Sequence, residues 1–383
     1  MRCRDYQSPV NDARVATKLT SHINIHHRIA YFVSPHGFGH AARATAVMTV
    51  LHDIDPEIHF DVFTRVPQWF FDDSICGQFA YHSLLTDIGL VQDSPLIEDL
   101  SKTVARLNEF LPFETNRIAR LAARVRKLEC ELAICDIAPL GIAVGKAAGI
   151  PTVLVENFTW DWIYRGYTRD EPRLEQPAAY MQRLFASADY HIQTEPVCRY
   201  DNADLVTPPV SRAPRMSRAA TREKLGIPRR AKTVLITMGG IPGRYEFLDL
   251  LEKQRNVYFV IPGAVTKYQA RGNVRLLPNH SVFYHPDLVN AVDGVVGKLG
   301  YSTVAEVYRA GIPLVYVARS RFRESRAIAP FVRKEMRGLE ISESELNDGR
   351  WLRHLPRVLD LPRLKLSRQD GASQAARFIT RRL

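Results

Sequence analysis

Short apolar runs alternate along the chain with longer segments in which apolar residues recur every three or four positions. Runs such as RIAYFVS at 28–34 and PTVLVENF at 151–158 predict buried parallel strands, and HAARATAVMTVLHDI at 40–54 predicts an amphipathic helix. Because strand-like and helix-like segments alternate, the pattern indicates an α/β protein built on parallel sheets.

The same pattern continues through both halves of the chain. In the first half it predicts strands at 58–64 and 131–137, and helices at 140–149 and over about 96–128, with a break at Pro112. In the second half it predicts the strands 232–240, 257–263, 292–300 and 313–319 and the helices 245–254, 302–311 and 371–382.

The composition changes between about 203 and 218, where LVTPPVSRAPRMSR carries three prolines and several basic residues. Proline-rich segments between periodic ones are typical of connections. A chain of 383 residues is also too long for one ordinary core. We therefore expect a disordered basic lead-in at 1–27 and two Rossmann-like domains at 28–205 and 206–383. The last helix of the second domain is expected to pack back on the first.

The overall composition, 46% hydrophobic and 24% charged residues, is that of a soluble globular protein. No apolar run is long enough to cross a membrane, and the N-terminus lacks the apolar core of a secretory signal. Five cysteines without CxxC spacing indicate neither a zinc site nor a disulfide framework, so a cytoplasmic location is expected. The net charge of +11 favours an anionic partner, although it is also compatible with solubility alone.

The first segment that carries candidate functional residues is PHGFGH, directly after the first predicted strand. Gly37 and Gly39 permit close approach of the backbone, and the start of the next helix offers free N–H groups. His36 or His40 can accept a proton from a hydroxyl near neutral pH. The spacing is not GxGxxG, so a dinucleotide fingerprint is absent. A tight turn with incidental histidines is the alternative interpretation.

The second segment is GKLGYSTVAE at 297–306, a glycine turn before a predicted helix. A helix N-terminus with a lysine and two hydroxyls suits a diphosphate, and Glu306 is placed to reach a ribose diol. The segment lacks Walker spacing, and an ordinary capped helix is the alternative. The paired glycines in TMGG at 237–240 would also let backbone amides approach a phosphate, but this motif is weaker evidence for phosphate binding.

Two more segments contain candidate ligand-binding residues. ENFTWDWIYRGY at 156–167 combines aromatic rings with acids and amides, which suits sugar or polyol binding, although core packing is the alternative. ARSRFRES at 318–325 follows a predicted strand, and solvated surface charge is its alternative interpretation.

Taken together, these motifs resemble GT-B glycosyltransferases. The nearer subset includes the bacterial N-acetylglucosaminyl transferase of peptidoglycan synthesis and the plant galactolipid synthases. The glycosyltransferase-like N-terminal half of plant L-arabinokinase is similar in more detail. It shares HGFGHAAR, NFTWDWIY and GKLGYSTVAE…GIPLVYVARSRFRES in the same order, over roughly 28 to the C-terminus. No separate glycine-serine ATP loop is found, so sugar-kinase activity is not expected.

The resemblance implies an acceptor role for the first domain and a nucleotide-sugar donor role for the second. It implies that His40 is the catalytic base, with Asp136 as a second base candidate or as the group that orients His40. The implied donor-binding residues are Gly239, Gly240, Lys298, Gly300, Ser302, Thr303, Glu306, Arg323 and Glu324. The implied acceptor-binding residues are His36, Gly37, Phe38, Gly39, Asn157, Trp160 and Asp161.

The implied reaction is inverting transfer from a nucleotide sugar, with UDP the expected nucleotide, and without a metal or another cofactor. The acceptor is left open among small metabolites, lipids and nucleic acids. Two alternatives stay open at this point: a non-catalytic nucleotide-sugar binding or regulatory module, and a UDP-sugar 2-epimerase.

Overall fold

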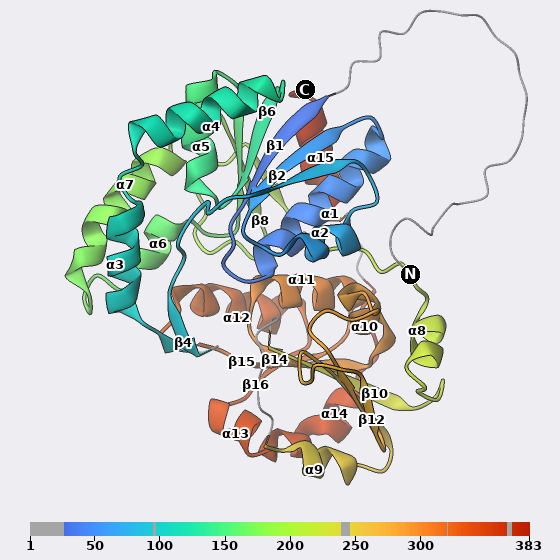
Figure 1. Ribbon diagram of the computed structural model, residues 1–383. Helices are drawn as coiled ribbons and strands as arrows, with labels where there is room; N and C mark the ends of the chain where they lie inside the picture. Colours follow the sequence, from blue (N-terminus) through green and yellow to red (C-terminus); the bar gives the residue numbers. More distant parts are fainter. Residues whose placement is uncertain (1–26, 95–96, 239–245, 320, 366–369) are drawn as a thin grey trace, which may run out of the picture.

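The computed structural model describes residues 27–94, 97–238, 246–319, 321–365 and 370–383 (Figure 1). The expected lead-in at 1–27 therefore lies outside the described residues, apart from His27. The predicted donor residues Gly239 and Gly240 also lie outside them.

The chain forms two α/β halves that lie one above the other in Figure 1. The first half contains a seven-stranded sheet in the order β3-β2-β1-β6-β7-β8-β9, in which every neighbouring pair is parallel. Its strands are β1 Arg28–Val33, β2 His59–Thr64, β3 Phe79–Ser83, β6 Leu132–Asp136, β7 Thr152–Glu156, β8 Tyr190–Thr194 and β9 Leu205–Thr207.

Apolar clusters cover both faces of this sheet, as expected for strands with continuous apolar runs. One cluster includes residues of α1 and α2, and the other includes residues of the helices that follow. The helices are α1 Gly39–Ile54, α2 Gln68–Ser74, α3 Leu100–Phe110, α4 Thr115–Lys127, α5 Pro139–Ala148, α6 Trp160–Arg165 and α7 Glu175–Phe185, with a 3₁₀ turn at Pro172–Leu174. A separate hairpin pairs β4 Gln92–Ser94 with β5 Ile97–Glu98.

The second half contains another seven-stranded sheet, in the order β12-β13-β11-β10-β14-β15-β16, with only the β12–β13 pair antiparallel. Its strands are β10 Lys232–Thr237, β11 Val257–Pro262, β12 Gln269–Arg271, β13 Val274–Leu277, β14 Gly294–Lys298, β15 Leu314–Val317 and β16 Gly338–Glu340. The helices are α8 Arg218–Lys224, α9 Leu248–Glu252, α10 His285–Ala291, α11 Tyr301–Ala310, α12 Arg323–Glu335, α13 Glu343–Asn347 and α14 Leu355–Leu359, with a 3₁₀ turn at Arg350–His354.

The last helix, α15 Gly371–Thr380, lies in the first half (red among the blue elements of Figure 1). Ala375, Ala376 and Ile379 are fully buried in the cluster that also holds Val47 of α1. Gly371 lies so close to the connection that an added Cβ would stand 2.0 Å from the carbonyl oxygen of Pro208. The chain therefore passes between the halves twice.

Most predicted elements are found, with differences at several boundaries. The predicted helix at 96–128 is split into α3 and α4 near Pro112, as expected, whereas the helix predicted at 245–254 is observed only as α9. Strand β9 pairs with β8 inside the predicted connection. Within the described residues, no helix is both long and apolar enough to span a bilayer. Cys130, Cys135 and Cys198 are free thiols and Cys76 is disulfide-bonded, which departs from the expectation at that one position.

In both sheets the strand order reverses next to the first strand. In the first sheet the chain runs outward from β1 to β3 and then returns to β6 on the other side of β1, where Val33 pairs with Asp136. In the second sheet the same reversal lies between β10 and β14, where Thr237 pairs with Gly297. Ligands of parallel α/β sheets bind beyond the carboxyl ends of the strands at such switch points.

Candidate functional site

At the switch point of the first sheet, a buried ion pair holds a histidine. Asp136 ends β6 and is fully buried, and Arg43 of α1 donates to both of its oxygens, with Nε–Oδ2 at 2.8 Å and Nη2–Oδ1 at 2.7 Å. His40, one helical turn before Arg43, places Nδ1 at 3.2 Å from Oδ1 of Asp136. A carboxylate can only accept, so Nδ1 carries the proton and Nε2 is left as the basic nitrogen.

Burial alone would raise the pKa of Asp136, but the Arg43 charge and the hydrogen bonds from His40 and Arg43 together lower it. Asp136 is therefore ionised at neutral pH and can stabilise a positive charge on the imidazole. The next residue, Ile137, has φ of 51°, which is strained for a β-branched side chain. Such strain is concentrated at functional sites, because surrounding packing has to maintain it.

The glycine–histidine loop joins β1 to α1 and lies against the second half of the molecule. Gly37 has φ of 74°, a conformation that favours glycine. A Cβ added at Gly39 would contact Oγ of Ser302 at 3.5 Å, so the N-terminus of α1 directly faces that of α11. Burial, together with the charges of His40, Arg319 and Lys298, lowers the pKa of His36 well below its usual value. His36 is therefore neutral at pH 7.

At the switch point of the second sheet, Lys298 ends β14 and Gly300 caps α11. An added Cβ at Gly297 would lie 1.9 Å from the carbonyl oxygen of Thr237, so only glycine lets β14 approach β10 this closely. Burial and the charge of Arg319, opposed by Glu324 and Glu98, lower the pKa of Lys298 to about 8. Helices α1 and α11 both lack acidic residues in their first turns, which leaves two positive helix ends at one place.

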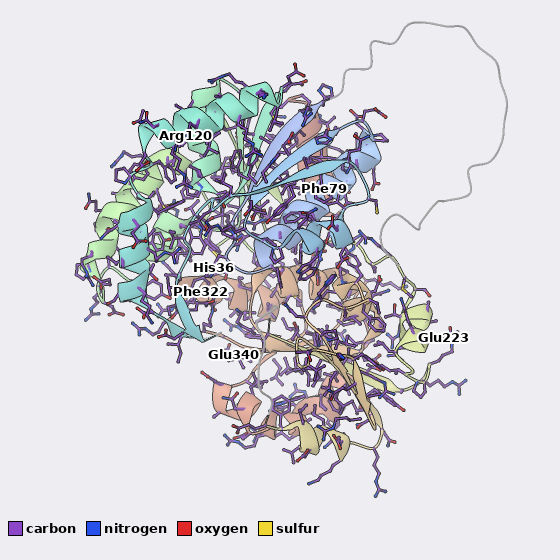
Figure 2. The ribbon with its side chains drawn as sticks, viewed as in Figure 1. His36, Phe79, Arg120, Glu223, Phe322 and Glu340 are labelled. Carbon is purple, nitrogen blue, oxygen red and sulfur yellow. The ribbon has the colours of Figure 1, made fainter. Side chains whose placement is uncertain are left out.

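Two adjoining cavities lie between the halves at these helix ends, and both are bordered by Phe38, Ser302 and Thr303. Their volumes are about 110 and 100 Å³, far more than one water molecule requires. We call them the Glu306 cavity and the His40 cavity. Figure 2 shows His36 and Phe322 where the two halves meet. The Glu306 cavity is bordered by Trp69, Phe70, Ser74, Arg212, Thr237, Tyr284, His285 and Glu306, among others. The His40 cavity is bordered by His36, Gly37, Gly39, His40, Arg43, Gln92, Asn157, Phe158, Lys298, Gly300, Tyr301, Arg319, Phe322 and Glu324.

Glu306 is held by Arg212 and His285. Its Oε1 accepts from Nε and Nη2 of Arg212, at 3.2 and 2.9 Å, and its Oε2 lies 2.7 Å from Nδ1 of His285. Although burial opposes it, the charges of Arg212 and His285 lower the pKa of Glu306 to about 2. Arg212 also donates to Oγ of Ser74 in the first half, at 3.2 Å. Oε2 keeps a free lone pair with which it can accept one hydroxyl of a ribose.

Across the His40 cavity, a hydrogen bond joins the two halves. Nδ2 of Asn157, after β7, donates to Oε1 of Glu324 in α12, at 3.1 Å. Oδ1 of the same Asn157 accepts from Nη1 of Arg43 at 2.8 Å. The predicted acceptor residue Asn157 and the predicted donor residue Glu324 are therefore parts of one network, which includes the His40–Asp136 pair.

Most of the predicted residues meet at the two cavities, but four described ones do not border them: Asp136, which is fully buried behind His40, and Trp160, Asp161 and Arg323. Arg323 donates Nη1 to the carbonyl oxygen of Trp162 at 2.8 Å and stacks its guanidinium on that ring, so it contacts the first half instead. Trp160 is fully buried beside the rings of His36 and Phe158. Asp161 is buried in the first turn of α6. The helical geometry of α6 turns these side chains into the core rather than into a cavity.

The charged or titratable cavity residues that were not identified from the sequence include Arg43, Arg212, His285 and Arg319. Arg43 lies within the HGFGHAAR motif, and its position three residues after His40 places both on one face of a helix. Arg319 lies within ARSRFRES. Arg212 lies in the proline-rich connection, and the sequence contains no signal that would pair it with Glu306. Within the described residues, no cluster of three His, Cys, Asp or Glu side chains is placed to hold a metal ion.

Comparison with known proteins finds one similar sequence and many similar structures. No protein-family model matches the chain. L-arabinokinase of Arabidopsis thaliana is 27% identical over 348 residues, which cover 87% of this chain. The chain spans about a third (32%) of the length of that relative.

Solved structures match over nearly the whole chain. The glycotransferase of kitacinnamycin has a TM-score of 0.63 at 15% identity, covering 93% of this chain and 99% of its own. A UDP-glucosyltransferase from Polygonum tinctorium that glucosylates indoxyl has a TM-score of 0.61 at 13% identity, with 93% and 98% covered. Phytolacca americana UGT2, complexed with UDP-2-fluoro-glucose and pterostilbene, has a TM-score of 0.55 at 13% identity, with 93% of both chains covered.

These matches confirm the predicted fold: the protein has the GT-B architecture of two facing Rossmann-like domains with cavities between them. The expected resemblance to L-arabinokinase is confirmed as well.

Proposed function

We propose that the protein is a glycosyltransferase that moves a sugar from a UDP-sugar to a hydroxyl group, with inversion at the anomeric carbon. The observation that carries the proposal is the convergence of two positive helix ends and Lys298 beside the His40–Asp136 pair, in one interdomain site. The matched structures support the UDP-sugar, because one of them is a UDP-glucosyltransferase and another holds UDP-2-fluoro-glucose.

In this proposal the nucleoside occupies the Glu306 cavity. Glu306 accepts a ribose hydroxyl at the free lone pair of Oε2, while Arg212 and His285 keep the carboxylate ionised and fixed in orientation. The diphosphate lies at the N-terminus of α11, where Ser302 and Thr303 border both cavities. The sugar then projects into the His40 cavity, beside Glu324 and the basic nitrogen of His40.

The reaction follows from this placement. His40 Nε2 removes the proton of the acceptor hydroxyl, and Asp136 stabilises the resulting imidazolium through Nδ1–H. The acceptor oxygen forms its bond to the anomeric carbon on the face opposite the diphosphate, and the bond to the diphosphate oxygen breaks. Lys298 and the helix ends stabilise the negative charge that leaves with UDP, and we propose that transfer needs no metal because these groups balance that charge.

The acceptor in this proposal is an alcohol of a small metabolite, a lipid or a nucleic acid. The net charge of +11 favours an anionic acceptor over a neutral one.

A thermal-shift titration with nucleotides tests donor binding. UDP and UDP-sugars should raise the melting temperature in a concentration-dependent way, because a ligand that binds only the folded state stabilises it. ADP- and GDP-sugars at equal concentration should raise it less. No shift with any nucleotide would contradict the proposal.

A turnover assay, following release of UDP from the bound UDP-sugar, tests the chemistry. His40→Gln should lower the rate about 10²- to 10⁴-fold without weakening donor binding. His52→Gln is the matched control, because His52 is also a buried histidine of α1, with Nε2 at 2.8 Å from the carbonyl oxygen of Ile58. The assignment of His40 fails if both variants turn over at the same rate.

A further inference from the structure

Tyr301, the first residue of α11, links the second half of the molecule to the first. Helix α11 lies along the top of the second half in Figure 1 and faces the first half. Tyr301 is 6% exposed and packs in an apolar cluster of the second half, yet its hydroxyl oxygen accepts from the backbone N–H of Val210 at 3.1 Å. Val210 belongs to the apolar cluster that includes residues of α1 and α15. The hydrogen bond therefore fixes the Tyr301 ring relative to the first half.

The Tyr301 ring lies against the guanidinium of Arg43. Cζ of Arg43 is 4.9 Å from the ring centroid. The three guanidinium nitrogens donate to Asp136 and Asn157, both in the first half. Arg43 is only 1% exposed, so the ring helps to exclude water from a cation whose nitrogens are already held by hydrogen bonds. A cation is attracted to an aromatic face, and more strongly where water is excluded.

The attraction comes from the ring face and not from a charged oxygen. Burial, opposed by the charge of Arg43 and by hydrogen bonds with Thr194 and Val210, raises the pKa of Tyr301 above its usual value. Tyr301 is therefore a neutral phenol at pH 7. It contacts the cation that fixes both oxygens of Asp136, and Asp136 in turn holds Nδ1 of His40 at 3.2 Å. Three successive contacts thus join the start of α11 to the candidate base.

We infer that Tyr301 is a positioning residue, whose ring holds Arg43 and, through Arg43 and Asp136, keeps His40 in the orientation that accepts the acceptor proton. The inference rests on the proposed function of the His40–Asp136 pair. Tyr301 begins the helix whose N-terminus is assigned to the diphosphate. The alignment of the base and the docking of the donor helix on the first half therefore depend on one side chain.

Tyr301→Phe and Tyr301→Leu form a matched pair that tests the ring. Both substitutions leave the N–H of Val210 without its acceptor, but only Tyr301→Leu removes the aromatic face. In the assay of UDP release, kcat of Tyr301→Leu should be about tenfold lower than kcat of Tyr301→Phe. Equal kcat values in the two folded variants would overturn the inference.

Donor affinity separates positioning from direct binding, because Tyr301 also borders the His40 cavity. Calorimetric titration should give Tyr301→Leu and Tyr301→Phe dissociation constants for the UDP-sugar within about twofold of each other, since the N–H groups at the start of α11 are unchanged. Weaker binding in Tyr301→Leu alone would assign the ring to the donor instead and overturn the positioning role.

Tyr308→Leu is the control for loss of a buried ring from the same helix. Tyr308 is 7% exposed, packs beside Phe331 at 5.6 Å between centroids, and is not among the described residues that border either cavity. Its kcat should stay within about twofold of the wild type. A loss as large as that of Tyr301→Leu would show that α11 packing in general sets the rate, and the inference would fail.

Urea unfolding tests the contact with Arg43 without relying on activity. Tyr301→Leu and Arg43→Met each remove the same ring–cation contact, so the double variant should lose less unfolding free energy than the two single losses added together. Losses that simply add would overturn the inference even if turnover had changed. Failure of the wild type to release UDP from any UDP-sugar would instead overturn the proposed function.

Discussion

At the β1–β6 switch point, the side chains of Arg43, Asp136 and Asn157 are joined by hydrogen bonds, whereas beside the β10–β14 switch point Nε and Nη1 of Arg319 make no hydrogen bond within the described residues. The strand topology is the same in both places. A saturated network holds a base in one orientation, and unsaturated donors are available to a ligand. The difference indicates that the first half of the molecule positions the chemistry and the second half binds the donor.

Substitution of Asp136 is the strongest test of this difference between the two halves. Asp136→Asn keeps the shape but cannot stabilise an imidazolium, so turnover should fall about 10²- to 10⁴-fold. The donor dissociation constant should stay within about twofold, because no predicted donor contact is removed. Turnover and donor titration on the same preparation measure both. A parallel loss of donor affinity would show that the two switch points are not separate in function.

Substitution of Arg43 tests whether the Arg43–Asp136–Asn157 network also stabilises the fold. Arg43→Met leaves the buried carboxylate of Asp136 without its cation, which should destabilise the fold by about 3–5 kcal/mol. The double variant Arg43→Met, Asp136→Asn should recover part of that loss, since the uncompensated charge is gone. Urea unfolding measures this double-mutant cycle, which comprises the wild type, both single variants and the double variant. Strict additivity would show that the two side chains are not coupled.

Asp87 is one of several exceptions in the first half, and both of its oxygens are buried without a hydrogen-bond partner within the described residues. Burial raises its pKa to about 8, opposed by Ser34 and Trp160 and helped by the charge of Asp136. The folded state thus holds a proton that the unfolded state has lost, and the stability of the wild type should decrease as the pH rises from about 4 to about 8.

Asp87→Asn removes this dependence. Relative to the wild type, it should gain on the order of 1–3 kcal/mol in unfolding free energy between pH 5 and pH 9. Melting temperatures of both proteins across that range measure the difference. Parallel curves for the two proteins would place Asp87 among the ordinary, fully ionised carboxylates.

Lys298 gives the smallest effect and tests the second half. With a pKa of about 8 it is mostly charged at pH 7 and mostly neutral at pH 9, so the affinity for a UDP-sugar should fall about tenfold over that range. Lys298→Arg remains charged and should flatten the dependence. Titrations at both pH values compare the two proteins. A wild-type affinity that does not change with pH would remove Lys298 from the diphosphate site.

The sequence predicted the architecture well because apolar periodicity reports burial directly. Lys298, Gly300, Ser302 and Thr303 were found together because one turn between a strand and a helix contains them all. The long-range pairings could not be read in this way. Arg212 lies 94 positions from Glu306, and Asn157 lies 167 positions from Glu324. Only the tertiary packing brings these side chains together, and no local pattern encodes that packing.

Trp160, Asp161 and Arg323 were predicted to bind ligands, but they do not border the two cavities. Their motifs looked functional because aromatic and charged residues were dense there. Arg323 instead joins the two halves by stacking on Trp162, and Trp160 packs inside the first half beside His36 and Phe158. A local sequence pattern cannot distinguish a side chain that contacts a ligand from one that supports the cavity wall from behind.

Helix α15 also determines the order in which the protein can be completed. Its apolar side packs against α1, more than 300 positions earlier in the chain. During synthesis, the first domain therefore exposes the apolar surface of α1 until the whole second domain has been translated and α15 has emerged. Contacts between such distant segments form slowly, because closing a long loop costs entropy before the contact is gained. The second domain, apart from α15 continuous in sequence, can fold earlier, so the half made first is the half that is finished last.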